Sequence, residues 1–410
     1  MKILVLSFYY APDLSAGSFR TTALIDALMK LRQTGLEVDV LTTSPNRYGS
    51  FDSDAPESEQ YEGLTIRRIA LPRHTSDVAG QARAFGVFAR GVLAELRGRR
   101  YDLVFGTSSR LMTAALAAVA ARRCGARLYL DVRDIFTDTI GDVFPSSYSW
   151  ALKSVFQHLE GWTVRSADKV NLVSKGFRDY FAARYPEVPL GFVSNGIDPE
   201  FLASADAEDT ARAVPAGHYA GPIRVVYAGN IGEGQGLHVV LPGIARRLAG
   251  RATFRIIGDG GRRAQLESAL AQAGCDNVDL VAPVPRIRLI EEYRSADVLF
   301  LHLNDYDAFR KVLPSKLFEY AALGKPVWAG VAGYAADFIH EEIENAAVFA
   351  PCDAAAAVES FDTLRLLHTP RRAFVARYRR EKLMEDLVRD VLAVATGPAR
   401  RVAGRAVPSR

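Results

Sequence analysis

The stretch Pro314–Val327 places polar side chains of three kinds within one turn of an expected helix. Ser315 is a suitable N-cap residue, and Lys316 and Glu319 are three residues apart, so that they share one helix face. Backbone N–H groups at a helix N-terminus and a neighbouring lysine attract an anion, while a carboxylate one turn later can accept hydrogen bonds from hydroxyl groups. This spacing predicts a site that binds a phosphate and a sugar hydroxyl together.

Glu319 has a structural and a functional interpretation. As a structural residue, it is an early-helix carboxylate that the helix dipole stabilises by about 0.3–1 kcal/mol. As a functional residue, it accepts hydrogen bonds from two vicinal hydroxyls, such as those of a ribose. The flanking residues Leu317, Phe318 and Tyr320 are apolar, so the helix is expected to be buried, and a buried carboxylate needs partners. We favour the functional interpretation.

Two glycine-rich loops each follow an expected strand in the second half of the chain. The loop from Gly229 to Gly236, which contains Asn230 and Gln235, opens a helix and would let backbone N–H groups approach an anion. Its glycine spacing differs from that of the dinucleotide-binding fingerprint. The second loop begins at Gly258-Asp259. A tight turn explains either loop alone, but two loops at neighbouring strand ends favour one shared pocket.

The first half offers charged residues in two segments. Gly17 opens an expected helix after the first strand, and Arg20 lies one turn in, where it could reach an anion. Asp131, Arg133 and Asp134 fall at the carboxyl end of a later strand. A buried Asp131–Arg133 pair could be purely architectural, or one of the two acids could face a substrate.

These residues need a scaffold, and the hydrophobic pattern predicts one. At 410 residues the chain is long enough for two domains with full cores. Strands rich in Val, Ile and Leu alternate with helical segments, which is typical of parallel sheets covered on both faces. The alternation stops at Ser194–Glu200, gives way to a polar stretch, and restarts at Ile223. We therefore expect an α/β protein with two doubly wound, Rossmann-like domains that face a cleft: residues 1–195, a linker over 196–222, and residues 223–370.

Composition narrows the possible partners and compartments. The net charge of the chain is +4, and four arginines in the tail 396–410 account for all of it. The rest of the chain is therefore near neutral. We expect the tail to be disordered and the protein to have no nucleic-acid partner. Three widely separated cysteines have no metal-ligand spacing, which indicates a reducing, cytoplasmic location without a bound metal. No apolar run reaches the length of about 20 residues that a membrane helix needs. Arg83, Arg90 and Arg97 recur on one face of an amphipathic segment, which is either solvated or in contact with an anionic membrane.

Several short motifs together resemble the GT-B fold glycosyltransferases of family 4, the retaining nucleotide-sugar transferases. The resemblance covers nearly the whole chain and rests on the order and spacing of these motifs. They are Tyr10-Ala-Pro-Asp-x-x-Ala-Gly17, Gly35-Leu-Glu-Val-Asp-Val-Leu-Thr42, Ala167-Asp-Lys-Val-x-x-Val-Ser174, Val193-Ser-Asn-Gly-Ile-Asp198, Tyr227-Ala-Gly-Asn-Ile-Gly232, Ile257-Gly-Asp-Gly260, Pro314-Ser-Lys-Leu-Phe-Glu-Tyr320 and Gly324-Lys-Pro-Val327. With Asp131-Val-Arg-Asp134, they are most similar to the branch that includes O-antigen fucosamine transferases.

The resemblance implies roles for individual residues. A nucleotide diphosphate sugar would lie mainly on the second domain, with Glu319 on the ribose hydroxyls, the loops at Gly229 and Gly258 beside the nucleotide, and Val281–Val284, including Pro283, near the base. Gly17 would approach the diphosphate from the first domain. The final helix, at about residues 371–395, would cross back onto that domain.

Three positions depart from the family pattern. Many members have a glutamate where this chain has Lys311, and an Arg and a Lys where it has Asn230 and Gln235. Lys316 could supply the missing positive charge.

The implied reaction is glycosyl transfer with retained configuration, in which positive charge and N–H dipoles stabilise the leaving nucleoside diphosphate. Asp134, Asp131 and Lys316 are the expected catalytic residues, the two acids orienting the acceptor or the donor sugar. No cofactor is implied, because the nucleotide sugar, expected to be UDP-linked, is a substrate. The expected acceptor is a polyprenyl-diphosphate-linked glycan in surface polysaccharide synthesis (O-antigen, capsule or exopolysaccharide), which places the protein in the cytoplasm or peripherally on the inner membrane face. A GT-B UDP-sugar epimerase and a non-catalytic nucleotide-sugar-binding partner are the alternatives.

Overall fold

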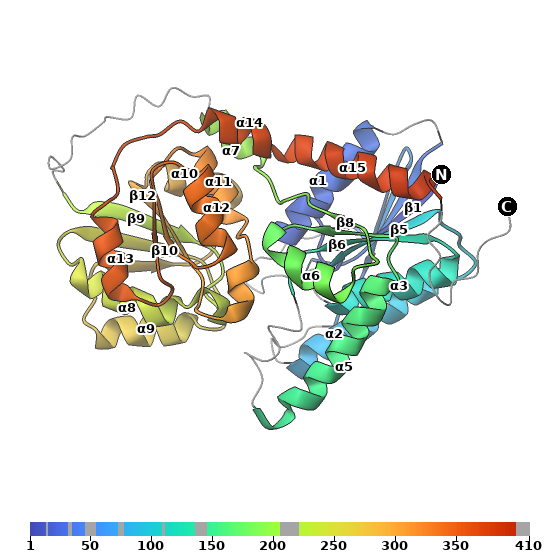
Figure 1. Ribbon diagram of the computed structural model, residues 1–410, viewed down its shortest axis with the longest axis horizontal. Coiled ribbons are helices and arrows are strands. Elements are labelled where there is room, and N and C mark those ends of the chain that lie inside the picture. Colours follow the sequence, from blue (N-terminus) through green and yellow to red (C-terminus); the bar gives the residue numbers. More distant parts are fainter. Residues whose placement is uncertain are drawn as a thin grey trace. The chain divides into compact units, whose positions relative to one another are not determined.

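The computed structural model describes residues 1–13, 15–31, 35–45, 55–72, 78–108, 111–135, 146–205 and 221–398. The chain forms two compact units (Figure 1). The first unit contains Met1–Asn195 and the chain from Glu381 onward, and the second contains Gly196–Arg380. The chain re-enters the first unit at Glu381, later than the expected position near residue 371. Most of the expected linker, residues 206–220, and the tail from residue 399 lie outside the described residues.

The first unit is built on an eight-stranded sheet of order β3-β4-β2-β1-β5-β6-β7-β8. Its inner strands are buried along their whole length, as in Leu103–Ser108, where small and polar residues are buried together with the apolar ones, and this suits a parallel sheet between helical layers. The strands are β1 (Lys2–Leu6), β2 (Glu37–Thr43), β3 (Ser58–Tyr61), β4 (Leu64–Ile69), β5 (Leu103–Ser108), β6 (Arg127–Val132), β7 (Lys169–Leu172) and β8 (Leu190–Gly191).

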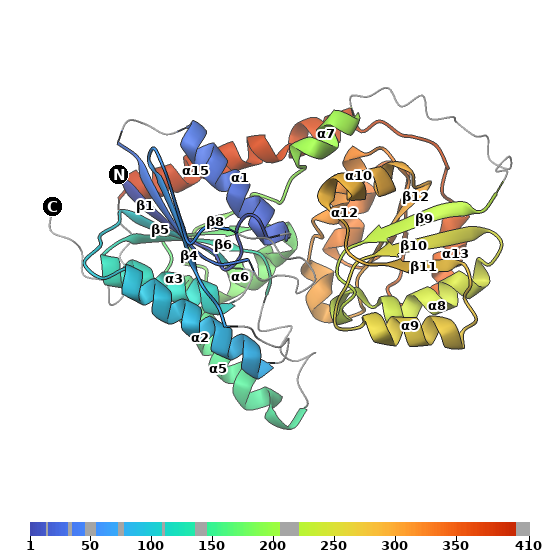
Figure 2. The ribbon, with the colours of Figure 1, turned by 180° about the vertical axis from the view of Figure 1, so that it is seen from behind.

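Helices cover both faces of this sheet. Leu24, Leu28, Leu387 and Val391 pack into one core with the central strands, so that α1 and α15 share a face, while α2, α3 and α5 cover the other (Figure 2). The helices of this unit are α1 (Ala16–Lys30), α2 (Val78–Glu95), α3 (Leu111–Cys124), α5 (Ser146–Arg165), the 3-10 helix η1 (Lys175–Phe177), α6 (Arg178–Arg184) and α15 (Arg380–Thr396).

The sequence did not predict β3. This strand has the polar sequence Ser58-Glu-Gln-Tyr61 and pairs antiparallel with β4 at the edge of an otherwise parallel sheet. A short edge strand buries little surface and therefore needs no apolar run. The single charged helix expected near the C-terminus is two helices, α14 (Arg372–Tyr378) and α15, with Arg379 between them.

The second unit has a six-stranded parallel sheet of order β11-β10-β9-β12-β13-β14. Its strands are β9 (Ile223–Ala228), β10 (Ala252–Ile257), β11 (Val278–Val281), β12 (Val298–His302), β13 (Val327–Gly330) and β14 (Ala346–Phe349). The chain builds outward from β9 in one direction and from β12 in the other, so the strand order reverses between these two neighbours. In doubly wound sheets, ligands bind at the carboxyl end of such a switch point.

Two helical layers enclose the second sheet. One core lies beneath α7, α10, α11, α12 and α14, and the other lies beneath α8, α9 and α13 (Figure 2). The segments are α7 (Pro199–Ala205), η2 (Glu233–Gln235), α8 (Leu237–Arg247), α9 (Arg263–Gln272), α10 (Arg286–Arg294), η3 (Asp307–Lys311), α11 (Lys316–Ala322), α12 (Tyr334–Glu342) and α13 (Ala354–Phe361). The predicted fold class, two doubly wound Rossmann-like α/β units, is confirmed.

Candidate functional site

The candidate ligand-binding site of the second unit lies at the switch point between β9 and β12. The loop after β9 begins at Gly229, and the segment after β12 leads into α11 with Lys316 and Glu319. The order of the strands therefore brings together two segments that are nearly 90 residues apart in sequence.

Lys316 is held against the end of β9. Its ammonium nitrogen lies 4.4 Å from the centre of the Tyr227 ring and 3.3 Å from the Tyr227 hydroxyl. That hydroxyl donates to the carbonyl of Asn230 at 2.6 Å and so fixes the ring. Burial lowers the pKa of Lys316 to about 8, although the Glu319 carboxylate favours the charged form. At neutral pH the residue is therefore a largely protonated cation in a poorly solvated place.

Glu319 is only partly exposed, and its carboxylate makes no hydrogen bond or ion pair with another described residue. Burial raises its pKa to about 7, against the opposing effect of the Arg286 guanidinium, and the Asp198 carboxylate raises it further. The Asp198 carboxylate in turn forms ion pairs with Arg286 and Arg380. The cations near Glu319 are thus partly neutralised, which leaves a carboxylate that can accept hydrogen bonds from a ligand.

Two glycines make room at this end of the sheet. A Cβ on Gly229, whose φ is +145°, would lie 2.1 Å from the Lys316 ammonium nitrogen. A Cβ on Gly258, whose φ is +152°, would lie 1.8 Å from the carbonyl oxygen of Gly229. Only glycine fits either position. The two glycine-rich loops therefore pack directly against each other, beside Lys316.

The remaining expected donor-binding residues fill local roles. Asn230 donates to the Gln235 side chain at 2.9 Å, which also accepts from the Gly232 N–H at 3.3 Å. The Asp259 carboxylate accepts from the Gly260 N–H at 2.8 Å, and Pro283 is partly buried just after β11.

The expectation that Ser315 caps α11 is wrong. Ser315 has a helical backbone conformation (φ −61°, ψ −28°), and its side chain forms no capping hydrogen bond. The helix itself has only seven residues, so its dipole is small, and the positive charge of the site comes from Lys316.

A buried bracing network, which sequence reasoning missed, holds the loop after β9. His302 is fully buried; its Nε2 accepts from the Cys352 N–H at 2.9 Å, so its Nδ1 donates to the Gln235 carbonyl at 2.7 Å. Burial lowers the pKa of His302 to about 4, so it is neutral. Asn304 donates to the carbonyls of Glu233 and Gly234, both at 2.9 Å. A single histidine at a strand end carries no sequence signal for this role.

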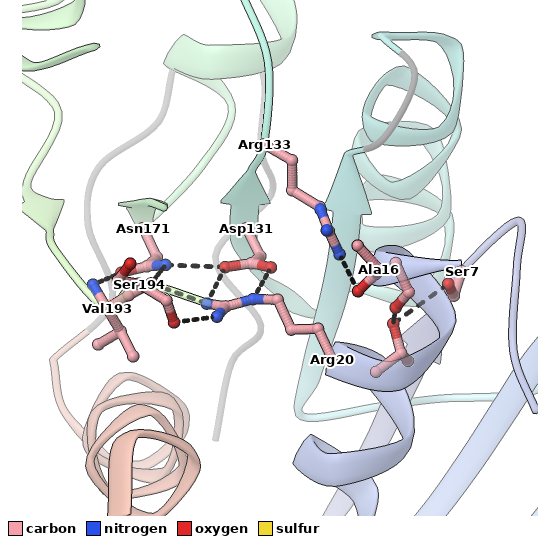
Figure 3. A network of polar contacts seen from close by, with 10 residues as sticks. Ser7, Ala16, Arg20, Asp131, Arg133, Asn171, Val193 and Ser194 are labelled. Carbon is pink, nitrogen blue, oxygen red and sulfur yellow. Dashed lines mark hydrogen bonds and ion pairs between the residues drawn. The ribbon is translucent and has the colours of Figure 1, made fainter. Parts of the chain in front are cut away.

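In the first unit, Arg20 and Asp131 form a buried ion pair (Figure 3). Two guanidinium nitrogens of Arg20 lie 2.8 Å from the two carboxylate oxygens, and Arg20 also donates to the carbonyls of Val193 and Ser194. Asn171 donates to Asp131 at 2.8 Å. Burial alone would raise the pKa of Asp131, but Arg20 holds it below its usual value.

This network changes the expectations for the first unit. Arg20, expected to reach an anion, is 1% exposed and committed to Asp131, so the architectural pair is Asp131–Arg20 and not Asp131–Arg133. Arg133 instead donates to the Ala16 carbonyl at 3.1 Å (Figure 3). Its guanidinium also lies close to Gly17, where an added Cβ would be 3.5 Å from one guanidinium nitrogen. Asp134 is exposed at the end of β6.

Two negative findings concern only the described part of the chain. No group of three or more His, Cys, Asp or Glu side chains there is arranged to hold a metal ion. No helix there combines the length and the apolar composition that crossing a bilayer requires.

Comparison with known proteins places the chain among glycosyl transferases. Residues 21–196 match the glycosyl transferase 4-like domain, and residues 211–382 match the glycosyl transferases group 1 family. The chain is 25% identical over 337 residues to WcaI of Escherichia coli strain K12, a protein assigned to colanic acid biosynthesis as a glycosyl transferase, covering 79% of this chain and 82% of WcaI.

Solved structures share the fold at low sequence identity. Sucrose-phosphate synthase from Thermosynechococcus elongatus has a TM-score of 0.72 at 16% identity, covering 96% of this chain and 99% of that one. Anabaena Alr3699/HepE, solved with UDP-glucose, has a TM-score of 0.62 at 15% identity, again covering 96% and 99%. Both halves of the chain therefore match glycosyl transferase domains, and the protein belongs to the group 1 glycosyltransferases with the GT-B fold.

Proposed function

We propose that the protein transfers a sugar, with retained configuration, from a UDP-sugar to a polyprenyl-diphosphate-linked glycan in surface polysaccharide synthesis. The observation that carries this proposal is the uncommitted carboxylate of Glu319, one turn after Lys316, at the switch point of the second sheet. Glu319 accepts hydrogen bonds from the ribose hydroxyls, and the motif resemblance points to the branch that includes O-antigen fucosamine transferases.

Lys316 supplies the charge for the diphosphate. A nucleoside diphosphate gains negative charge as it leaves the sugar, and a preorganised cation in a poorly solvated site stabilises that charge strongly. Asn230 and Gln235 are neutral and bonded to each other, so they contribute no cation. The ammonium of Lys316, fixed over Tyr227, takes the place of the arginine and lysine that many family members have there.

Asp134 is the stronger candidate of the two expected acids in the first unit. Asp134 is exposed, whereas both carboxylate oxygens of Asp131 accept hydrogen bonds from Arg20, and one of them also accepts a hydrogen bond from Asn171. We propose that Asp134 orients a sugar hydroxyl, and that Asp131 fixes the chain at Val193 and Ser194 through Arg20. Arg133, beside Gly17, adds a positive charge at the start of α1.

The acceptor assignment draws on the relatives and on α2. WcaI is assigned to colanic acid biosynthesis, and HepE was solved with UDP-glucose. Along α2, Arg83, Arg90 and the following Arg97 are exposed, while Phe88 and Val92 are buried beneath the helix. We propose that this basic face holds the protein on the inner face of the cytoplasmic membrane. In a flotation assay, the protein should rise with anionic vesicles at low salt and separate from them at high salt.

The deciding experiment is transfer. The full-length protein is incubated with a panel of radiolabelled UDP-sugars and a polyprenyl-diphosphate N-acetylhexosamine, and the lipid fraction is counted. Label should enter the lipid with the wild type, and at a donor concentration below saturation it should enter at least tenfold more slowly with Glu319→Ala. If UDP binds but no donor yields a labelled lipid, the non-catalytic alternative replaces this proposal.

The epimerase alternative needs no acceptor. It predicts that UDP-N-acetylhexosamine alone is converted to its epimer, which chromatography of the nucleotide sugars detects. The transfer proposal predicts an unchanged nucleotide sugar until the lipid acceptor is added.

A further inference from the structure

We propose that the first unit carries a second ligand site, which binds an uncharged or amino-bearing saccharide and lies outside the nucleotide-binding residues. The site is a hollow of about 590 Å³ lined by Tyr10, Asp26, Glu59, Tyr61, Glu62 and Arg68, together with apolar residues of β4 and α1. We call it the hairpin hollow. A volume of this size falls within the usual range for small-ligand pockets of about 300–1,000 Å³.

Strand register explains why these side chains converge. In the β3–β4 hairpin, Tyr61 lies opposite Leu64 and Glu59 lies opposite Ile66, so all four side chains share one face of the sheet. Arg68 follows on the same face two residues later. The antiparallel edge strand that the sequence did not predict therefore forms one wall of the hollow.

The hollow offers aromatic surface. Tyr61 is 60% exposed, unusual for so large a ring, and its hydroxyl donates to the Glu59 carboxylate at 2.6 Å. Tyr10, only 6% exposed, lies deeper in the same hollow. A ring held by its hydroxyl at the mouth of a hollow presents a flat apolar surface that suits the C–H face of a pyranose.

Arg68 supplies an unsatisfied donor. It is 7% exposed, and it donates to the carbonyls of Pro56 at 2.9 Å and Ala11 at 3.0 Å and forms an ion pair with Glu59. Its Nε is buried and has no hydrogen-bond partner among the described residues. An unpaired buried donor is costly, so Arg68 stands in the wall of the hollow with hydrogen-bonding capacity that the described residues do not use.

The charge of the hollow selects the ligand class. Among the described residues that line the hollow, Asp26, Glu59 and Glu62 contribute three carboxylates and Arg68 contributes one guanidinium. This excess of negative charge disfavours phosphates, nucleotides and anionic lipids. Carboxylates instead accept hydrogen bonds from hydroxyl groups and attract amines. An uncharged sugar chain, or one that carries a free amine, satisfies both the aromatic and the acidic groups.

The test uses full-length protein without any donor, so that its result does not depend on transfer. The probes are lactose, N,N′-diacetylchitobiose and chitobiose, with lactobionic acid as an anionic counterpart of lactose. Saturation-transfer difference NMR detects contact, and titration gives the affinity. We expect contact with at least one neutral or amino-bearing disaccharide, weaker binding of lactobionic acid, and no displacement by UDP.

Matched variants locate the site. Tyr61→Ala should lower the affinity at least tenfold, because it removes the exposed ring. Gln60→Ala, an exposed neighbour on the opposite face of β3, should leave the affinity unchanged. The proposal is overturned if no disaccharide gives saturation transfer, if the two variants behave alike, or if UDP displaces the sugar. A chain that binds sugars in this way but transfers none would refute the proposed function and leave this site standing.

Discussion

The ammonium nitrogen of Lys316 lies 4.4 Å from the ring centre of Tyr227, which is 89 residues earlier in the chain. A cation over an aromatic face is attracted by about 0.5–2 kcal/mol, depending on its desolvation. The contact fixes the cation beside Gly229, where a bulkier residue would collide with it. It also leaves Glu319, one turn further along α11, without a committed partner among the described residues.

Glu319→Ala should weaken UDP binding at least tenfold, because two ribose hydroxyls lose a charged acceptor at a cost of about 1.5–3 kcal/mol. Isothermal titration calorimetry measures the effect. Glu341→Ala, which changes an exposed carboxylate on α12, is the control and should bind UDP like the wild type. Equal UDP affinity in the Glu319 variant would remove the ribose assignment.

UDP affinity should pass through a maximum between about pH 7 and pH 8. Glu319 accepts hydrogen bonds only when ionised, and its pKa of about 7 means that affinity rises as the pH increases through 7. Lys316 attracts the diphosphate only when protonated, and its pKa of about 8 means that affinity falls above pH 8. Glu319→Gln should abolish the acid limb and Lys316→Met the alkaline limb. Flat profiles in the wild type would contradict both assignments.

Glu319→Gln should stabilise the protein at alkaline pH. The pKa of Glu319 is raised in the folded state from 4.5 to about 7, so folding disfavours the ionised carboxylate. The cost appears as the pH rises from 4.5 to 7 and stays constant above, at about 3 kcal/mol. Thermal unfolding should therefore give a higher midpoint for Glu319→Gln at pH 8.5 and no difference at pH 4.5. A lower midpoint at pH 8.5 would show that the carboxylate is stabilising.

Gly229→Ala should abolish UDP binding. Its φ of +145° and the predicted distance of 2.1 Å to the Lys316 nitrogen mean that the methyl group must displace the ammonium. Gly250→Ala is the matched control, since Gly250 also has a positive φ of +76° but no atom within 4 Å of the added Cβ. The control should lose about 1 kcal/mol of stability from backbone strain and keep its UDP affinity. Similar UDP affinity in the two variants would argue against a role for the Lys316 position.

Asp131→Asn should act on stability and spare UDP binding. Removing one charge of a buried pair leaves Arg20 uncompensated, which typically costs about 3–5 kcal/mol. Urea unfolding measures the loss, and calorimetry with UDP provides the comparison. A variant of normal stability that binds UDP but transfers no sugar would instead make Asp131 a catalytic residue.

Much of the fold could be predicted from the sequence because the hydrophobic pattern that specifies strands and helices is local. Strands rich in Val, Ile and Leu, such as β1 and β12, are buried along most of their length, and their alternation with helices predicts two parallel sheets. The strand β3 escaped prediction because a four-residue polar strand at a sheet edge is specified by its partner and not by its own residues. For the same reason the hairpin hollow was invisible before the register was known.

At the site, the sequence by itself determined the residue types: the helix with Lys316 and Glu319, and the glycines at 229 and 258. Only the tertiary structure decided their partners. Arg20 and Asp131 are 111 residues apart in sequence, and they bind each other through two hydrogen bonds. Neither side chain is therefore available for the role that its position after a strand had suggested, anion binding for Arg20 and substrate contact for Asp131. Lys316 and Tyr227 met because the strand order reverses between β9 and β12. The local hydrophobic pattern determines whether a segment forms a helix or a strand. The pairing of buried charges depends instead on which segments the sheet brings together.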